Sequence, residues 1–119
     1  MHAALEKRFS SEIAQAQRLL KRGSLDEAFA HLECAHVLGQ RYIVPHVRTH
    51  WLMLRIGVSR RSVAEVMGQA ARIVLGALGS AIGAVPTGNT GGTNISMFRR
   101  LPIDPEIENV LNERQKPNI

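Results

Sequence analysis

Four of the five histidines in this chain lie in one window of 20 residues, between positions 31 and 50. The only cysteine and one glutamate fall in the same window, so the candidate ligands are His31, Glu33, Cys34, His36, His46 and His50. Imidazole, thiolate and carboxylate groups are the side chains that bind zinc, copper, nickel and similar ions. The window therefore offers the chemistry of a transition-metal site.

The last two of these histidines, His46 and His50, are four residues apart. On a helix this spacing places both rings on one face about one turn apart, where they can hold one ion. Burying two imidazoles without partners costs free energy, so each must find a metal, a carboxylate or a backbone carbonyl. A pair of hydrogen-bonded structural histidines is the alternative interpretation, and the spacing alone leaves both open.

The other candidates form two pairs, Glu33 with His36 and His31 with Cys34, on opposite flanks of one predicted helix. One helix cannot direct both pairs to a single ion. Because the turn at 40–44 is short, the helices predicted at 24–38 and 44–56 should be antiparallel neighbours. The pair of Glu33 and His36 should then lie nearer to His46 and His50. The predicted ligands of zinc or another divalent transition ion are therefore His36, His46, His50 and Glu33, and less favourably His31 and Cys34.

Two other chemistries compete with the metal site. Cys34 could act as a nucleophile if His31 or His36 served as its base, but it lies late in a helix, where the helix dipole raises a thiol pKa. The glycine-rich segment 88–94 could hold an anion through backbone amides, yet it lacks the lysine and serine or threonine of a phosphate-binding loop. An enzyme is thus less favoured than a binding protein, and 88–94 is predicted to be a structural loop.

The elements that must position these residues are predicted to be helices, because apolar residues recur at three- and four-residue spacing and aromatic residues make up only 4%. The fold class is all-α, a compact array of two helical hairpins similar to tetratricopeptide units. A glycine-rich loop and a short last helix follow. The predicted elements of this single domain, 1–119, are helices at 4–22, 24–38, 44–56 and 62–78, the loop 86–104 and a helix at 105–113.

Several local signals support these boundaries. Ser24 with Glu27 and Ser62 with Glu65 are predicted to be capping boxes at helix starts, and Gly39 is predicted to end its helix in the left-handed conformation. The last long helix is expected to bury its apolar stripe, which consists of Val63, Val66, Met67, Ala70, Ile73, Val74 and Ala77.

The most apolar stretch, residues 73–85, would span only about 20 Å as a helix, too short to cross a membrane. Its glycines at 76, 79 and 83 predict the close approach of another backbone. It also offers a surface through which two copies of the chain could form a homodimer.

The net charge of +5 invites a nucleic-acid hypothesis. The excess of lysine and arginine lies in residues 1–61, but it is thinly spread and not interleaved with aromatic residues. A solvated basic face is therefore favoured, and no nucleic-acid partner is expected. A single cysteine and the lack of a hydrophobic leader predict a cytoplasmic protein.

Three ordered motifs resemble a known family. They are His-Leu-Glu-x-Ala-His-x-Leu-Gly-Gln-Arg-Tyr at 31–42, Pro-His-x-Arg-Thr-His-Trp at 45–51 and Pro-x-Gly-Asn-Thr-Gly-Gly-x-Asn at 86–94. The resemblance is to small bacterial proteins catalogued as a domain of unknown function, and it covers about residues 10–112. It implies a link to heavy-metal handling, because such genes often lie beside metal efflux pumps. The family's recurrent residues correspond to His31, Glu33, His36, His46, His50 and 88–94, whereas the position of Cys34 usually carries another residue.

Two functions of different classes follow from these observations. The first is a cytoplasmic accessory protein that sequesters or senses a divalent transition ion. The second is a helical protein–protein interaction module whose histidines are structural and bind no metal.

Overall fold

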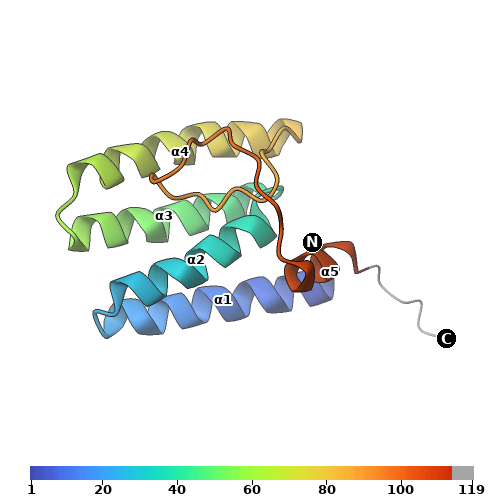
Figure 1. Ribbon diagram of the computed structural model, residues 1–119, viewed down its shortest axis with the longest axis horizontal. Helices are drawn as coiled ribbons and strands as arrows, with labels where there is room; N and C mark the ends of the chain where they lie inside the picture. The colour runs from blue at the N-terminus through green and yellow to red at the C-terminus, as the bar shows by residue number, and fades with distance from the viewer. Residues whose placement is uncertain (114–119) are drawn as a thin grey trace.

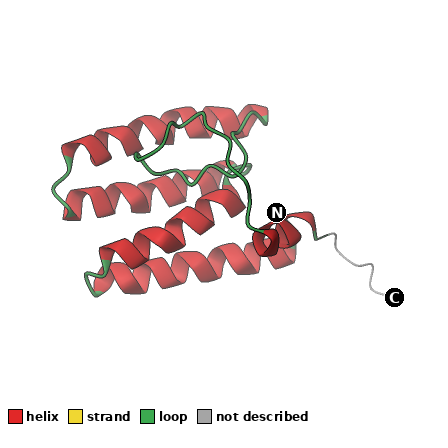
Figure 2. Ribbon diagram, in the orientation of Figure 1, coloured by secondary structure: helices red, strands yellow, loops and turns green. Residues whose placement is uncertain are grey.

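The computed structural model describes residues 1–113, and within this range it contains five helices and no strand. The helices are α1 (Ala3–Lys21), α2 (Leu25–Gly39), α3 (Ile43–Ser59), α4 (Val63–Ile82) and α5 (Pro105–Asn112). The first four lie side by side in chain order, with α1 packed on α2, α2 on α3 and α3 on α4 (Figures 1 and 2). The predicted all-α class and its two hairpins, α1/α2 and α3/α4, are confirmed.

The apolar core lies between α1 and α2 and extends to the side of α3 that faces them. The apolar stripe of α1 is buried at Leu5, Phe9, Ile13 and Ala16, and residues of α2 and α3 complete the cluster. Each fully buried leucine, isoleucine or phenylalanine contributes about 1.5–3 kcal/mol to the free energy of unfolding. Gly23 has φ +76° just after α1, a left-handed conformation that a glycine adopts at a helix end. The core thus lies to one side of the candidate ligands and holds α2 and α3 together.

Of the two serines predicted to cap helices, only one forms a capping hydrogen bond. Ser62 Oγ accepts the backbone N–H of Glu65 at 3.2 Å, as a capping residue should. Ser24 occupies the N-cap position of α2, but its side chain makes no capping hydrogen bond. The prediction of a capping box is therefore wrong at Ser24, although the helix begins where it was expected.

Gly39 does not end α2 in the left-handed conformation, as the sequence predicted; it remains within the helix. A Cβ atom at this position would lie 2.9 Å from both the Phe9 ring and Pro45 Cβ. The glycine is therefore required because α1 and the start of α3 approach α2 closely here. This approach brings the end of α2 against the first turns of α3.

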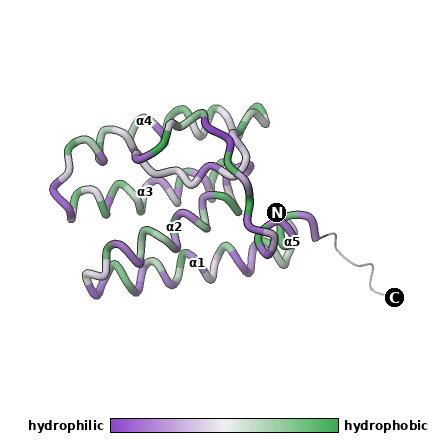
Figure 3. Tube along the Cα trace, viewed as in Figure 1, coloured by the Kyte–Doolittle hydropathy of each residue, from purple (hydrophilic) through white to green (hydrophobic). Residues whose placement is uncertain are grey.

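The helix α4 exposes part of the apolar stripe that was predicted to be buried, while Val66, Ala70, Ile73 and Ala77 are half-buried. Val63, Met67 and Val74 were expected to be buried, and each is more than 60% exposed. The buried residues of α4 are instead polar: Gln69, Arg72 and Ser80. Few positions of α4 are hydrophilic (Figure 3). The sequence pattern therefore did not indicate which face of the helix is buried. In the described part of the chain, no helix combines the length and apolar character needed to cross a membrane.

The chain from Gly83 to Asp104 returns across the second hairpin and leads to α5, which packs on α1 (Figure 1). Arg8 Nη1 donates to Glu106 Oε1 at 2.7 Å, and Ile107, Val110 and Leu111 rest against the core. The returning loop is tied by the Asn89 side chain, whose Nδ2 donates to the carbonyls of Ser96 and Arg99. The 88–94 loop is thus a structural cover over α2, α3 and α4.

Candidate metal centre

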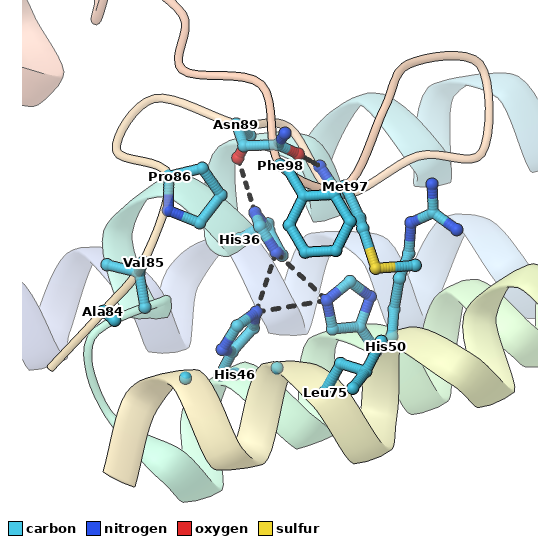
Figure 4. A pocket seen from close by; sticks show the side chains of 14 residues that line it. His36, His46, His50, Leu75, Ala84, Val85, Pro86, Asn89, Met97 and Phe98 are labelled. Carbon is cyan, nitrogen blue, oxygen red and sulfur yellow. Dashed lines mark hydrogen bonds between the residues drawn. The ribbon is translucent and has the colours of Figure 1, made fainter. Parts of the chain in front are cut away.

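Three histidine rings converge on one point where α2, α3 and the returning loop meet. His36 comes from the end of α2, and His46 and His50 lie one turn apart on α3. Their Nε2 atoms are 2.9 Å apart for His36–His46 and 3.1 Å apart for both His36–His50 and His46–His50 (Figure 4). The three residues are only 2–4% exposed. Among the described residues, these side chains form the one group able to offer three such ligand atoms to an ion.

The separation of these nitrogens suits a single metal ion. Three nitrogens bound to one zinc ion at about 2.0–2.1 Å would lie about 2.9 Å apart at right angles and about 3.3 Å apart at tetrahedral angles. The three Nε2–Nε2 distances, 2.9, 3.1 and 3.1 Å, fall within this range. Small movements of the rings would therefore be enough to bind an ion to all three.

The hydrogen bonds on the far side of the rings fix where the ring protons are. His36 Nδ1 lies 2.5 Å from the Asn89 carbonyl, which can only accept, so this nitrogen donates. His46 Nδ1 lies 2.7 Å from Ser80 Oγ. The Ser80 hydroxyl donates its only hydrogen to the Gln40 carbonyl at 2.6 Å, so it accepts from His46. Both rings therefore carry their proton on Nδ1.

The third ring is fixed in the same way through a glutamine. Gln69 Nε2 donates to the Gly91 carbonyl at 3.0 Å, which turns Gln69 Oε1 toward His50 Nδ1 at 2.6 Å. An amide oxygen only accepts, so His50 also carries its proton on Nδ1. All three neutral rings thus direct an Nε2 lone pair, and no hydrogen, at the shared point. This is the arrangement of a metal site whose outer hydrogen bonds orient the ligands.

Burial keeps the three rings neutral. It places the pKa of His36 well below the ordinary value, and the repulsion that protonated His50 and His46 would exert lowers this pKa further. Burial also lowers the pKa of His46, and it lowers the pKa of His50 to about 4. Because a metal competes with protons for Nε2, depressed pKa values leave these nitrogens free to bind an ion at neutral pH.

Two glycines make the space that the rings occupy. A Cβ at Gly76 would lie 2.8 Å from Cε1 of His46, and a Cβ at Gly91 would lie 2.6 Å from Cδ2 of His36. The sequence predicted that another backbone approaches the glycines of 73–85. At Gly76 the neighbour is an imidazole ring, whereas Gly79 does face a backbone oxygen, that of Ala84.

The remaining predicted ligands lie away from the three Nε2 atoms. Burial raises the pKa of Glu33, and a hydrogen bond with the Thr90 side chain opposes this rise. His31 Nδ1 pairs with Glu12 Oε2 at 2.6 Å, on the side of α2 that faces α1. Cys34 is half-buried, and burial raises the pKa of its thiol to about 11, which keeps the thiol protonated at neutral pH. The structure therefore brings together His36, His46 and His50 but not the other three.

Comparison with known proteins assigns the chain to a family. The family described as "Protein of unknown function (DUF3703)" matches residues 3–111. The chain belongs to DUF3703. The expected membership of a family without an assigned function is thereby confirmed. No curated protein and no solved structure matches the chain.

Three residues of this DUF3703 chain that hold the rings were not predicted from the sequence: Gln69, Ser80 and Asn89. On α4, Gln69, Arg72, Gly76 and Ser80 recur at helical spacing as a polar and glycine face in an otherwise apolar helix. That face was a signal that α4 turns toward polar partners. Asn89 acts through its backbone carbonyl, so its side-chain type gave no indication of contact with His36.

Proposed function

We propose that this protein is a cytoplasmic accessory protein that binds a divalent transition ion through His36, His46 and His50 and sequesters or senses it. The observation that carries the proposal is the convergence of three Nε2 lone pairs whose Nδ1 protons are all committed elsewhere. Lone pairs 2.9–3.1 Å apart repel one another unless a cation lies between them. A metal ion relieves this repulsion at all three rings.

A proton is the alternative cation, and it fits less well. One proton could bridge two Nε2 atoms, but the third lone pair would still face the same point. Burial also lowers the pKa of all three histidines, so a proton is not retained there at neutral pH. A divalent ion avoids both difficulties because it accepts three nitrogen ligands at once.

The ligand set suggests the class of ion. Three imidazoles without a thiolate suit zinc, nickel, cobalt and copper(II) better than the soft ion copper(I). Three protein ligands leave at least one coordination position open, unlike the four-ligand sites that only stabilise folds. The proposed link to heavy-metal handling rests on the family resemblance, and an exchangeable ion would suit sequestration or sensing.

The test is metal uptake by protein purified without an affinity tag. We expect the wild type to retain one cobalt(II) or zinc ion per chain after dialysis. His46→Ala should lower the affinity by more than about 100-fold, because an inner ligand is lost and outer hydrogen-bonding partners alone are worth 10–100-fold. Isothermal titration and elemental analysis measure both quantities.

The matched control is His31→Ala, which removes a histidine of α2 that pairs with Glu12 and not with the three-histidine cluster. It should keep the wild-type stoichiometry and affinity. If the wild type takes up no ion, or if His46→Ala binds the ion as tightly as His31→Ala, the proposed site is wrong.

A second candidate function is self-association, which the exposed face of α4 favours. Six large apolar side chains lie on one exposed stripe along this helix: Val63, Met67, Val74, Leu75, Leu78 and Ile82. Such a stripe is self-complementary when a second copy packs against it around a two-fold axis. We propose that two copies associate through this stripe, which includes part of the 73–85 segment.

Sedimentation equilibrium tests the self-association. The wild type should be dimeric, and a double variant with Val74→Lys and Leu78→Lys should be monomeric with the same helical content. The matched control is a double variant with Ser10→Lys and Ser11→Lys, at two exposed positions of α1. This control should remain dimeric. A monomeric wild type at all concentrations would exclude this surface as a dimer interface.

A further inference from the structure

A cavity of about 80 Å³ opens beside the three Nε2 atoms. Apart from the histidines, its walls are mainly apolar, and they include Leu75, Val85, Pro86, Met97 and Phe98 (Figure 4). A water molecule needs about 10–15 Å³ of such space, so the cavity holds a group of several atoms. Because the histidines line this cavity, an ion bound to them would present its open coordination position to it.

The cavity also has one buried cation in its wall, Arg72 from α4. This residue is only 9% exposed. Its Nη1 and Nη2 donate to the carbonyls of Gly68 and Ile95, both at 3.0 Å, but its Nε has no hydrogen-bond partner. Among residues 1–113, no carboxylate forms an ion pair with it.

A buried guanidinium without an anion is costly, and an unpaired buried N–H adds to the cost. The positive charge lies close enough to the rings to lower the pKa of His36 and His50. A bound divalent ion would bring the local charge to about +3, since the three imidazoles are neutral, and no acidic side chain of the described chain lines the cavity. The site would therefore carry uncompensated positive charge, and the residues that line the cavity supply no negative charge to balance it.

We infer that this cavity binds a small monovalent anion, which coordinates the metal at its open position and is attracted by the positive charge of Arg72 in the cavity wall. The inference rests on the proposed function, because the metal is one of the two partners of the anion. The apolar walls provide few hydrogen bonds, so they favour weakly hydrated anions such as thiocyanate or azide. Strongly hydrated dianions such as sulfate would lose too much solvation to enter.

The experiment uses cobalt(II)-loaded full-length protein, whose visible absorption reports the ligands of the metal. Thiocyanate should change the spectrum saturably with one anion per cobalt, and sulfate should leave it unchanged. In Arg72→Gln, thiocyanate should bind about 10–100-fold more weakly, because the positive charge near the anion is lost. Arg72→Lys should bind thiocyanate nearly as tightly as the wild type because it keeps the positive charge.

The control is Arg55→Gln, an exposed arginine of α3 that does not line this cavity; its thiocyanate affinity should equal that of the wild type. If the wild type binds cobalt but its spectrum does not respond to thiocyanate, the anion site is wrong and the metal site stands. If Arg72→Lys binds cobalt but binds thiocyanate more than about 10-fold more weakly than the wild type, the role of the Arg72 charge is wrong, even where Arg72→Gln fails to fold. If the wild type binds no cobalt, the proposed function fails and this inference fails with it.

Discussion

Excess zinc is expected to raise the melting temperature of the metal-free protein by about 15 °C or more. An ion that binds only the folded chain at 1,000 times its dissociation constant adds about 4 kcal/mol to the free energy of unfolding. For a domain of this size, each kcal/mol shifts the melting temperature by about 4 °C. Repulsion among the three Nε2 lone pairs destabilises the metal-free fold, so relief of that repulsion contributes to the gain. Circular dichroism melts at increasing zinc concentration measure the shift.

Two glutamine variants separate this effect from non-specific binding. His46→Gln should melt at nearly the same temperature with and without zinc, because its site keeps only two ring ligands. His31→Gln should show a zinc-dependent shift like that of the wild type, since His31 pairs with Glu12 and not with the cluster. A wild-type melting temperature that zinc does not change would favour the interaction module with purely structural histidines.

The position of the three rings was predictable because it depends on short-range geometry. The spacing of His46 and His50 on one helix sets their common face, and the short connection after α2 brings His36 near them. Glu33 was a plausible fourth ligand by the same spacing, three residues before His36. Its carboxylate lies on the side where the Thr90 loop returns, and periodicity along one helix does not report that loop.

The orientation of α4 was not predictable from its apolar periodicity. A periodic stripe shows that a helix has two different faces, but burial of one face depends on what packs against it. Here α3 presents imidazole rings, which need hydrogen-bond acceptors and space. Gln69 and Ser80 provide the acceptors, and Gly76 provides the space, so large apolar residues such as Met67 and Val74 are left on the outside.

The loop contact with His36 could not be predicted because it joins residues that are 53 positions apart. The acceptor is the backbone carbonyl of Asn89, and every residue has such a carbonyl. The Asn89 side chain instead binds Ser96, Arg99 and Gly91 and so shapes the loop. The segment 88–94 was expected to be a structural loop, but the sequence did not indicate that its backbone binds His36.

Acid is expected to destabilise the metal-free protein between pH 7 and pH 5. The pKa of His50 is about 4 in the folded chain and about 6.5 in the unfolded chain. Between these values the unfolded state binds more protons, so stability is complete above pH 6.5 and is lost as the pH falls toward 4. His50 alone should lower the free energy of unfolding by about 2 kcal/mol between pH 7 and pH 5. The depressed pKa values of His36 and His46 act in the same direction.

Urea unfolding in the presence of a chelator at pH 7 and pH 5 measures this loss, and His50→Gln should reduce it because that ring no longer titrates. Glu33 acts in the opposite direction, since burial raises its pKa and favours the protonated folded form as the pH falls. Its half-exposed side chain makes this effect the smaller one. A metal-free protein as stable at pH 5 as at pH 7 would mean that the folded cluster already holds a proton. The Nε2 atoms would then share an N–H hydrogen bond, and the argument from three unpartnered lone pairs would no longer support a metal.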